Sequence, residues 1–103
     1  MALEFDETKL EKAAGFLKVL AHPVRIKIIY TLEDKEINVQ DLVEAVGTTQ
    51  PNVSQHLTIM RERNILSFRR EANQIFYRVG DCRVLEFVNF AKTAFCEPPN
   101  EEP

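Results

Sequence analysis

Apolar residues recur at helical spacing through the first half of the chain and predict three helices. The first is expected over residues 4–20. His22-Pro23 breaks the pattern, and the proline is well placed to open a second helix over residues 24–32. A third helix follows Asn38, whose side chain is suited to cap it, and Gly47 ends it because glycine readily adopts positive φ.

A three-residue turn, Gly47-Thr48-Thr49, separates the third helix from a fourth that we expect over residues 52–64. Thr49 or Gln50 is the expected cap, because Pro51 is tolerated only in the first turn of a helix. The face of this helix that points away from the core carries mostly uncharged polar side chains: Asn52, Ser54, Gln55, Thr58 and Arg61. A helix that is merely solvated usually favours Glu and Lys, which are better helix formers.

Two stretches rich in β-favouring residues follow, 65–71 and 74–79, with Ala72-Asn73 as the hairpin turn. Asp81 caps a last helix that runs to about Cys96. This order predicts a mainly α fold with a β-hairpin, a winged helix-turn-helix of order α-α-α-α-β-β-α. We expect one domain over residues 1–97 and a disordered tail over residues 98–103.

The composition fits one small domain, with 103 residues of which 45% are hydrophobic. No apolar run approaches the ~20 residues of a membrane span, and the N-terminus has acids where a signal peptide needs bases. The two cysteines, Cys82 and Cys96, are too few for a disulfide framework. We therefore expect a cytoplasmic protein without membrane contacts.

Charge is distributed unevenly along the chain. The net charge is −3, yet residues 47–80 contain five bases and two acids, whereas both flanking segments are acidic. Local charge rather than total charge sets what a surface attracts. A basic segment that coincides with the helix-turn-helix therefore favours a nucleic-acid partner, although a swing of this size also occurs on ordinary solvated surfaces.

The helix-turn-helix and the hairpin together predict a sequence-specific DNA-binding regulator. Uncharged polar side chains on the fourth helix suit the base edges of the major groove, and arginines suit phosphates. The predicted contact residues are Thr49, Gln50, Asn52, Ser54, Gln55, His56, Thr58, Arg61, Arg69 and Arg70. Two readings stay open beside this one: His56 is half-buried, or the whole basic face binds a protein as a winged-helix interaction module.

The sequence does not indicate an enzyme, because it has no glycine-rich phosphate loop, nucleophile motif or metal cluster.

The last helix predicts a homodimer. Its apolar residues cover an arc of about 220°, more than the stripe of about 100° that one domain core needs. We expect the surplus to pair with a second copy through the first and last helices, at Leu10, Leu17, Val84, Phe87, Val88, Ala91 and Phe95. Two reading helices ~34–36 Å apart then match a palindromic operator on double-stranded DNA.

Two stretches, LAHPVRIKI at 20–28 and QPNVSQHL at 50–57, resemble the ArsR family of bacterial winged-helix repressors. The resemblance covers roughly residues 10–96. It implies a homodimer that represses transcription from operator DNA and that an inducer releases, with Ser54, Gln55 and His56 at base-reading positions. The wing tip departs from the family, because Ala72-Asn73 stands where a glycine is frequent.

The same resemblance implies that the family's zinc-type sites are not intact and that no metal cofactor is bound. Asn38-Val39-Gln40 stands in place of a C-V-C-type run. On the last helix Asp81 and Glu97 match, but Arg83 and Ala94 replace the histidines. The chain's own histidines, His22 and His56, have no second ligand at i+3 or i+4.

Cys82 and Cys96 are the candidate sensor thiols. Fourteen residues of continuous helix separate them by about 21 Å, whereas a disulfide needs Cα atoms within ~7 Å. Cys82 lies near a helix N-terminus beside Arg83, an environment that favours a reactive thiolate. The alternatives are two incidental thiols, or metalloid binding that brings thiolates together across a dimer.

Overall fold

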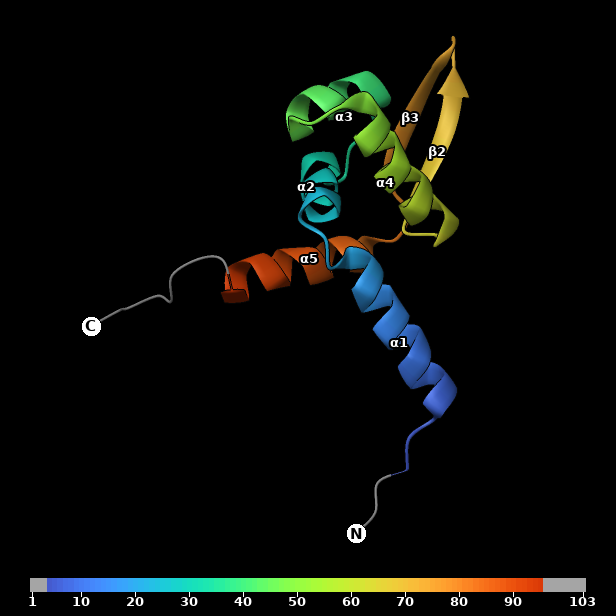
Figure 1. The fold of residues 1–103 in the computed structure, drawn as a ribbon, viewed down its shortest axis with the longest axis vertical. Coiled ribbons are helices and arrows are strands. Elements are labelled where there is room, and N and C mark those ends of the chain that lie inside the picture. Colours follow the sequence, from blue (N-terminus) through green and yellow to red (C-terminus); the bar gives the residue numbers. More distant parts are fainter. Residues whose placement is uncertain (1–3, 96–103) are drawn as a thin grey trace, which may run out of the picture.

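The structure is a computed structural model, and it describes residues 4–95 (Figure 1). Helices and strands follow one another in the order α1 (Glu7–Leu20), α2 (Pro23–Leu32), β1 (Ile37–Asn38), α3 (Val39–Val46), α4 (Gln50–Glu62), β2 (Leu66–Glu71), β3 (Gln74–Val79) and α5 (Cys82–Phe95). This is the predicted winged helix-turn-helix with one strand added, since β1 was not expected. The predicted tail at residues 98–103 lies outside the described residues.

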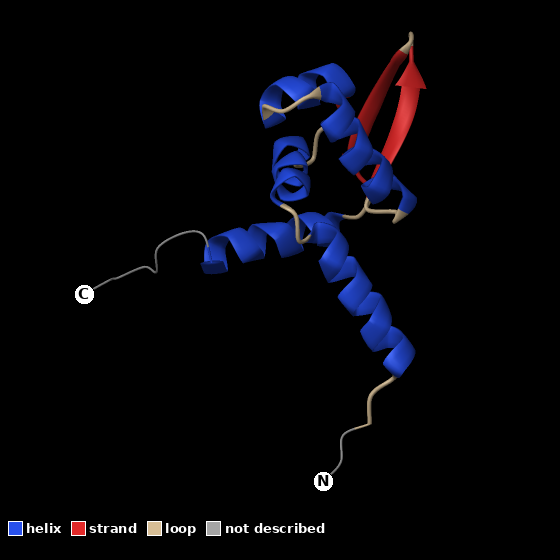
Figure 2. Ribbon diagram, in the orientation of Figure 1, coloured by secondary structure: helices blue, strands red, loops and turns tan. Residues whose placement is uncertain are grey.

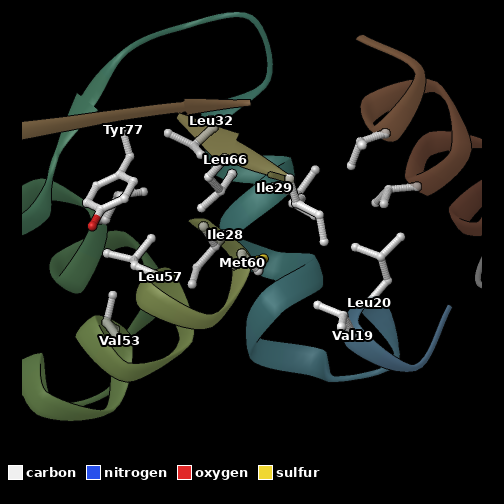
Figure 3. Packing of buried hydrophobic residues seen from close by; sticks show 14 of the residues in the cluster. Val19, Leu20, Ile28, Ile29, Leu32, Val53, Leu57, Met60, Leu66 and Tyr77 are labelled. Carbon is white, nitrogen blue, oxygen red and sulfur yellow. The ribbon is translucent and has the colours of Figure 1, made fainter. Parts of the chain in front are cut away.

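The core forms where α2, α3, α4, α5 and the base of the hairpin meet (Figure 3). Helix α2 lies at its centre, and Ile28, Ile29 and Leu32 are fully buried. Helix α4 contributes Val53, Leu57 and Met60 from its inward face, as the sequence pattern predicts. Burying an aliphatic side chain of this size stabilises the fold by about 1.5–3 kcal/mol, so this apolar face determines which side of α4 points outward.

The turn between α3 and α4 is set by local chemistry. Asn38 caps α3 by accepting the Asp41 N–H at 2.8 Å. Gly47 ends that helix in the left-handed region, with φ of 84°. Thr49 then caps α4 by accepting the Asn52 N–H at 3.3 Å. The cap at Thr49 starts α4 at Gln50, two residues before the predicted start.

The hairpin is part of a three-stranded antiparallel sheet of order β1-β3-β2. Its turn is at Ala72 and Asn73, with φ of 49° and 68°, as the sequence predicts. Strand β1 has only two residues, Ile37 and Asn38, which pair with Tyr77 and Phe76. Two residues are too few to show an alternating pattern, which is why the sequence carries no signal for this strand.

Helices α1 and α5 lie at the end of the molecule opposite the hairpin tip, and α1 projects away from the body (Figures 1 and 2). The C-terminal part of α1 is anchored to the body through the buried Val19 and Leu20. Phe16 adds an edge-to-face contact with Phe87 of α5, with ring centroids 6.0 Å apart. Within residues 4–95, no helix is long and apolar enough to cross a membrane.

Candidate nucleic-acid interface

The outward face of α4 gathers most of the predicted contact residues. Gln50 and Gln55 are exposed, and Asn52, Ser54, Thr58 and Arg61 are partly exposed along the same helix. The Thr58 hydroxyl donates to the Ser54 carbonyl at 2.9 Å, and Asn52 donates to the Thr48 hydroxyl at 3.3 Å. Gln55 makes no such internal hydrogen bond among the described residues, so its amide has both donor and acceptor available for a base edge.

His56 takes the buried alternative that the sequence left open, because its imidazole points inward. It is 7% exposed, and its Nδ1 accepts a hydrogen bond from Arg25 Nε at 3.1 Å. The ring also lies 4.3 Å from the ring of His22. Burial lowers the pKa of His56, and the charges of His22 and Arg25 lower it further. His56 therefore belongs to the packing between α2 and α4 and not to the surface that faces DNA.

Two carboxylates of the same chain hold Arg69, a pairing that the sequence did not predict. Its Nε lies 3.0 and 2.9 Å from the two carboxylate oxygens of Glu36, and its Nη1 lies 2.9 Å from Glu71. Hydrogen bonding to the guanidinium lowers the pKa of Glu36, so the pair is ionised at neutral pH. Glu36 and Arg69 are far apart in the chain, and no local pattern links them.

Arg70 is free to contact phosphate, although that contact itself stays a prediction. It is exposed, and within residues 4–95 it takes part in no ion pair. Adjacent residues of a strand point to opposite faces of the sheet, so Arg70 lies on the face that Arg69 does not occupy. Arg61 of α4 lies 5.0 Å from the centre of the Phe68 ring and connects this face to the helix.

A polar groove of about 240 Å³ separates α4 from the tip of the hairpin. Amide and hydroxyl side chains line it together with two apolar ones: Asn38, Gln40, Gln50, Ser54, Asn73 and Gln74, with Val39 and Ile75. Sequence reasoning missed Gln40, Asn73 and Gln74. Their uncharged polar character, like that of α4, was the available signal, but their proximity depends on how the hairpin folds back over α3.

At the start of α5, the guanidinium of Arg83 forms an ion pair with the carboxylate of Asp81. Arg83 donates to Asp81 through Nε at 3.1 Å and through Nη2 at 2.7 Å, and these bonds lower the pKa of Asp81 to about 2. No group of three or more potential metal ligands exists among residues 4–95. Cys82 is exposed and forms no disulfide, while Cys96 lies outside the described residues.

An apolar groove of about 390 Å³ runs between α1, α2 and α5. Phe87, Phe95 and Leu17 line it and are all substantially exposed, and Leu10 and Phe90 are exposed on the same two helices. Ala91 is partly exposed at its wall. Val84 corrects the prediction, because it is 5% exposed, belongs to the protomer's own core and does not line this groove. Val88 is 3% exposed and also part of the core, but it lies at the floor of the groove.

Comparisons with known proteins place the chain among bacterial regulators. The profile of the family described as "Bacterial regulatory protein, arsR family" matches residues 22–67. The chain is 38% identical over 96 residues to the "Biofilm growth-associated repressor" of Xylella fastidiosa, a match that spans 93% of this chain and 84% of the relative. It is 40% identical over 78 residues to the "Nodulation protein NolR" of Rhizobium meliloti, spanning 76% of this chain and 64% of the relative.

Solved structures give the same picture. The crystal structure of the transcriptional repressor BigR from Xylella fastidiosa matches with a TM-score of 0.80 and 38% identity, over 89% of this chain and 94% of the other. NolR from Sinorhizobium fredii matches with a TM-score of 0.81 and 32% identity, over 95% of this chain and 100% of the other.

Proposed function

The chain belongs to the ArsR family of bacterial regulatory proteins, and on this premise we propose that it is a DNA-binding transcriptional repressor that acts as a homodimer on a palindromic operator. The observation that supports this most is the outward face of α4, where uncharged polar side chains are exposed or partly exposed. The hairpin adds an exposed arginine, Arg70, which takes part in no ion pair within residues 4–95. A protein-binding module has no comparable need for hydrogen-bonding groups without charge along a single helix face.

Different residues of this surface contact the bases and the phosphates in the proposed complex. Gln55 and its neighbours on α4 offer hydrogen-bond donors and acceptors to base edges, which carry the sequence information. Arg61 and Arg70 supply charge for phosphates, which carry affinity but no sequence information. The polar groove between α4 and the hairpin tip adds Gln40 and Gln74 as further groups for the DNA backbone.

The proposed functional unit is a dimer of two copies of this chain. Helix α1 projects from the body with Leu10 and Leu17 exposed, and α5 exposes Phe87, Phe90 and Phe95. Apolar surface of this extent on two neighbouring helices typically marks an interface. A two-fold pairing through α1 and α5 leaves both α4 helices and both hairpins free for the two half-sites of a palindrome.

Release from DNA is proposed to run through an inducer or through modification of the exposed Cys82, without a resident metal cofactor. The Asp81–Arg83 ion pair supports the absence of a metal cofactor, because the guanidinium of Arg83 already neutralises the carboxylate that α5 could offer to a metal ion. Thiol-based metalloid binding requires a further thiolate near Cys82 and is a weaker alternative.

The test is a titration of duplex DNA with the protein at several salt concentrations. The logarithm of the affinity of a protein that neutralises several phosphates falls linearly with the logarithm of salt concentration, and we expect this for wild type. Arg70→Gln should reduce that slope by about one. A protein-interaction module would bind duplex DNA weakly at every salt concentration and would show no dependence on Arg70.

A further inference from the structure

The hairpin is tied to the start of α3 by side chains on one face of the sheet. Arg69 of β2 lies opposite Phe76 of β3, and Asn38 of β1 lies opposite Phe76 on its other side. Side chains in one such row point to the same face of a sheet. Glu36, two residues before Asn38, shares that face, so a row of side chains runs across all three strands.

Arg69 is held from three sides within this row. Both carboxylate oxygens of Glu36 accept from its Nε, Glu71 accepts from its Nη1, and its guanidinium lies 4.7 Å from the centre of the Phe76 ring. A second link, from Asn38 Nδ2 to Gln74 Oε1 at 3.3 Å, joins β1 to the tip of β3. Because Asn38 also caps α3, these links connect the hairpin to the first helix of the helix-turn-helix.

The opposite face of the hairpin is the one that meets α4. Phe68 and the buried Tyr77 pack on this face with ring centroids 5.9 Å apart, and Arg61 of α4 lies over Phe68. Arg70 shares this face by alternation with Arg69. The two adjacent arginines are therefore in different environments. Arg69 is bound to carboxylates of its own chain, whereas Arg70 forms no ion pair within residues 4–95 and lies on the sheet face that carries Phe68.

We propose that Arg69 is a positioning residue, which with Glu36 fixes the angle between the hairpin and the helix-turn-helix, and that Arg70 is the hairpin residue that meets phosphate. This inference rests on the proposed DNA-binding function. Without the ion pairs of Arg69, the outer part of the hairpin is held less firmly against the body, so DNA binding must then order it. Glu36 thus strengthens DNA binding even though its charge opposes that of DNA.

The sign of one substitution separates this role from a direct contact. Glu36→Gln removes a negative charge and releases Arg69. If Arg69 positions the hairpin, affinity falls, by about threefold to fivefold for one exposed ion-pair network. If Arg69 is instead a phosphate contact held back by Glu36, the same substitution raises affinity and steepens the salt dependence by about one.

The experiment measures binding to a duplex that the wild-type protein selects from a random-sequence library. Asp34→Asn is the matched control, because Asp34 lies in the same loop, loses the same charge and forms no ion pair within residues 4–95. The exchanged pair, Glu36→Arg with Arg69→Glu, should restore most of the affinity if the clamp matters. If Arg69 contacts phosphate directly, the exchanged pair would place a carboxylate against DNA. The doubly substituted protein would then bind DNA far more weakly than either single variant.

Amide hydrogen exchange without DNA gives a readout that does not depend on the proposed function. We expect the amides of β2 and β3 to exchange faster in Glu36→Gln and to regain protection in the exchanged pair. Tighter DNA binding by Glu36→Gln, or behaviour equal to Asp34→Asn in both affinity and exchange, would overturn the proposal. If the wild-type protein selects no duplex, the proposed function fails, while the exchange data still decide whether the clamp exists.

Discussion

The rings of His22 and His56 lie 4.3 Å apart, and each uses Nδ1 as a hydrogen-bond acceptor. His22 accepts from the Val24 N–H at the start of α2, and His56 accepts from Arg25 Nε. A proton on either Nδ1 would place a donor against a donor and a positive charge beside Arg25. The neutral state of His56 is therefore part of the packing between α2 and α4.

The first prediction is that stability falls as the solution becomes mildly acidic. The pKa of His56 is lower in the folded chain than its ordinary value of 6.5, so the unfolded chain takes up the proton first as pH falls. The contribution of neutral His56 to the free energy of unfolding is fully present above pH 6.5 and declines as the pH falls below this value. Urea unfolding across this range should show a shallower decline for His56→Asn, whose amide oxygen still accepts from Arg25; an equal decline would contradict the assignment.

A second prediction concerns Arg25, which joins three helices. Its Nε donates to His56 of α4, and its Nη1 donates to the Val19 carbonyl at the end of α1, at 2.8 Å. Arg25→Ala leaves these acceptors without partners in a largely buried site, at a cost of about 1–3 kcal/mol in the free energy of unfolding. Chemical denaturation measures this cost. Lys35→Ala, at an exposed ion pair with Glu33, is the control and should change stability by less than about 1 kcal/mol.

Two glycines provide a matched pair for the third prediction. Gly47 has φ of 84° and open space where a Cβ would lie, so Gly47→Ala should destabilise by about 1–2 kcal/mol through backbone strain alone. Gly15 lies inside α1, where an added Cβ meets only Arg63 at an ordinary 3.8 Å. Gly15→Ala should therefore stabilise by about 0.5–1 kcal/mol. A thermal unfolding temperature of Gly47→Ala equal to or above that of wild type would show that the turn does not depend on its glycine.

Local chemistry explains why most of the fold was predictable. Thr49, Gly47 and Asn73 act through their own backbone and the next few residues, so their effects can be read directly from the sequence. Strand β1 was missed because its two residues gain strand character only by pairing with β3.

The contacts that the sequence did not show are between residues distant in the chain. His56 takes the buried position that the sequence left open and accepts from Arg25, and Arg69 forms an ion pair with Glu36. Val84 and Val88 lie on the wide apolar arc of α5, and periodicity alone does not tell which part of such an arc faces the protomer's own core.

The fourth prediction separates the interface from the core. Leu17→Glu combined with Phe90→Glu changes one exposed residue on each of α1 and α5, at 47% and 69% exposure, and should give a folded monomer. Val88→Asp places a carboxylate in the core and should destabilise by about 4 kcal/mol or more. Sedimentation and circular dichroism distinguish the two outcomes. A double variant that stays dimeric at micromolar concentration rules out this interface.

The fifth prediction concerns the exposed thiol. If modification of Cys82 releases the protein from DNA, an oxidant should lower affinity for wild type and leave Cys82→Ser unaffected, and micromolar zinc should affect neither. Fluorescence anisotropy of a labelled duplex follows both additions. Release by zinc would contradict the absence of a resident metal site, and an oxidant response that survives in Cys82→Ser would exclude this thiol.

Selection from a random-sequence duplex library tests the central claim most directly. The account predicts enrichment of an inverted repeat whose half-sites lie about one helical turn apart. Gln55→Ala should lose about 1–3 kcal/mol of discrimination at one position in each half-site, while Asn89→Ala on α5 should select the wild-type sequence. No enriched sequence, or an enriched sequence that Gln55→Ala recognises with unchanged discrimination, would contradict a repressor that reads DNA through α4.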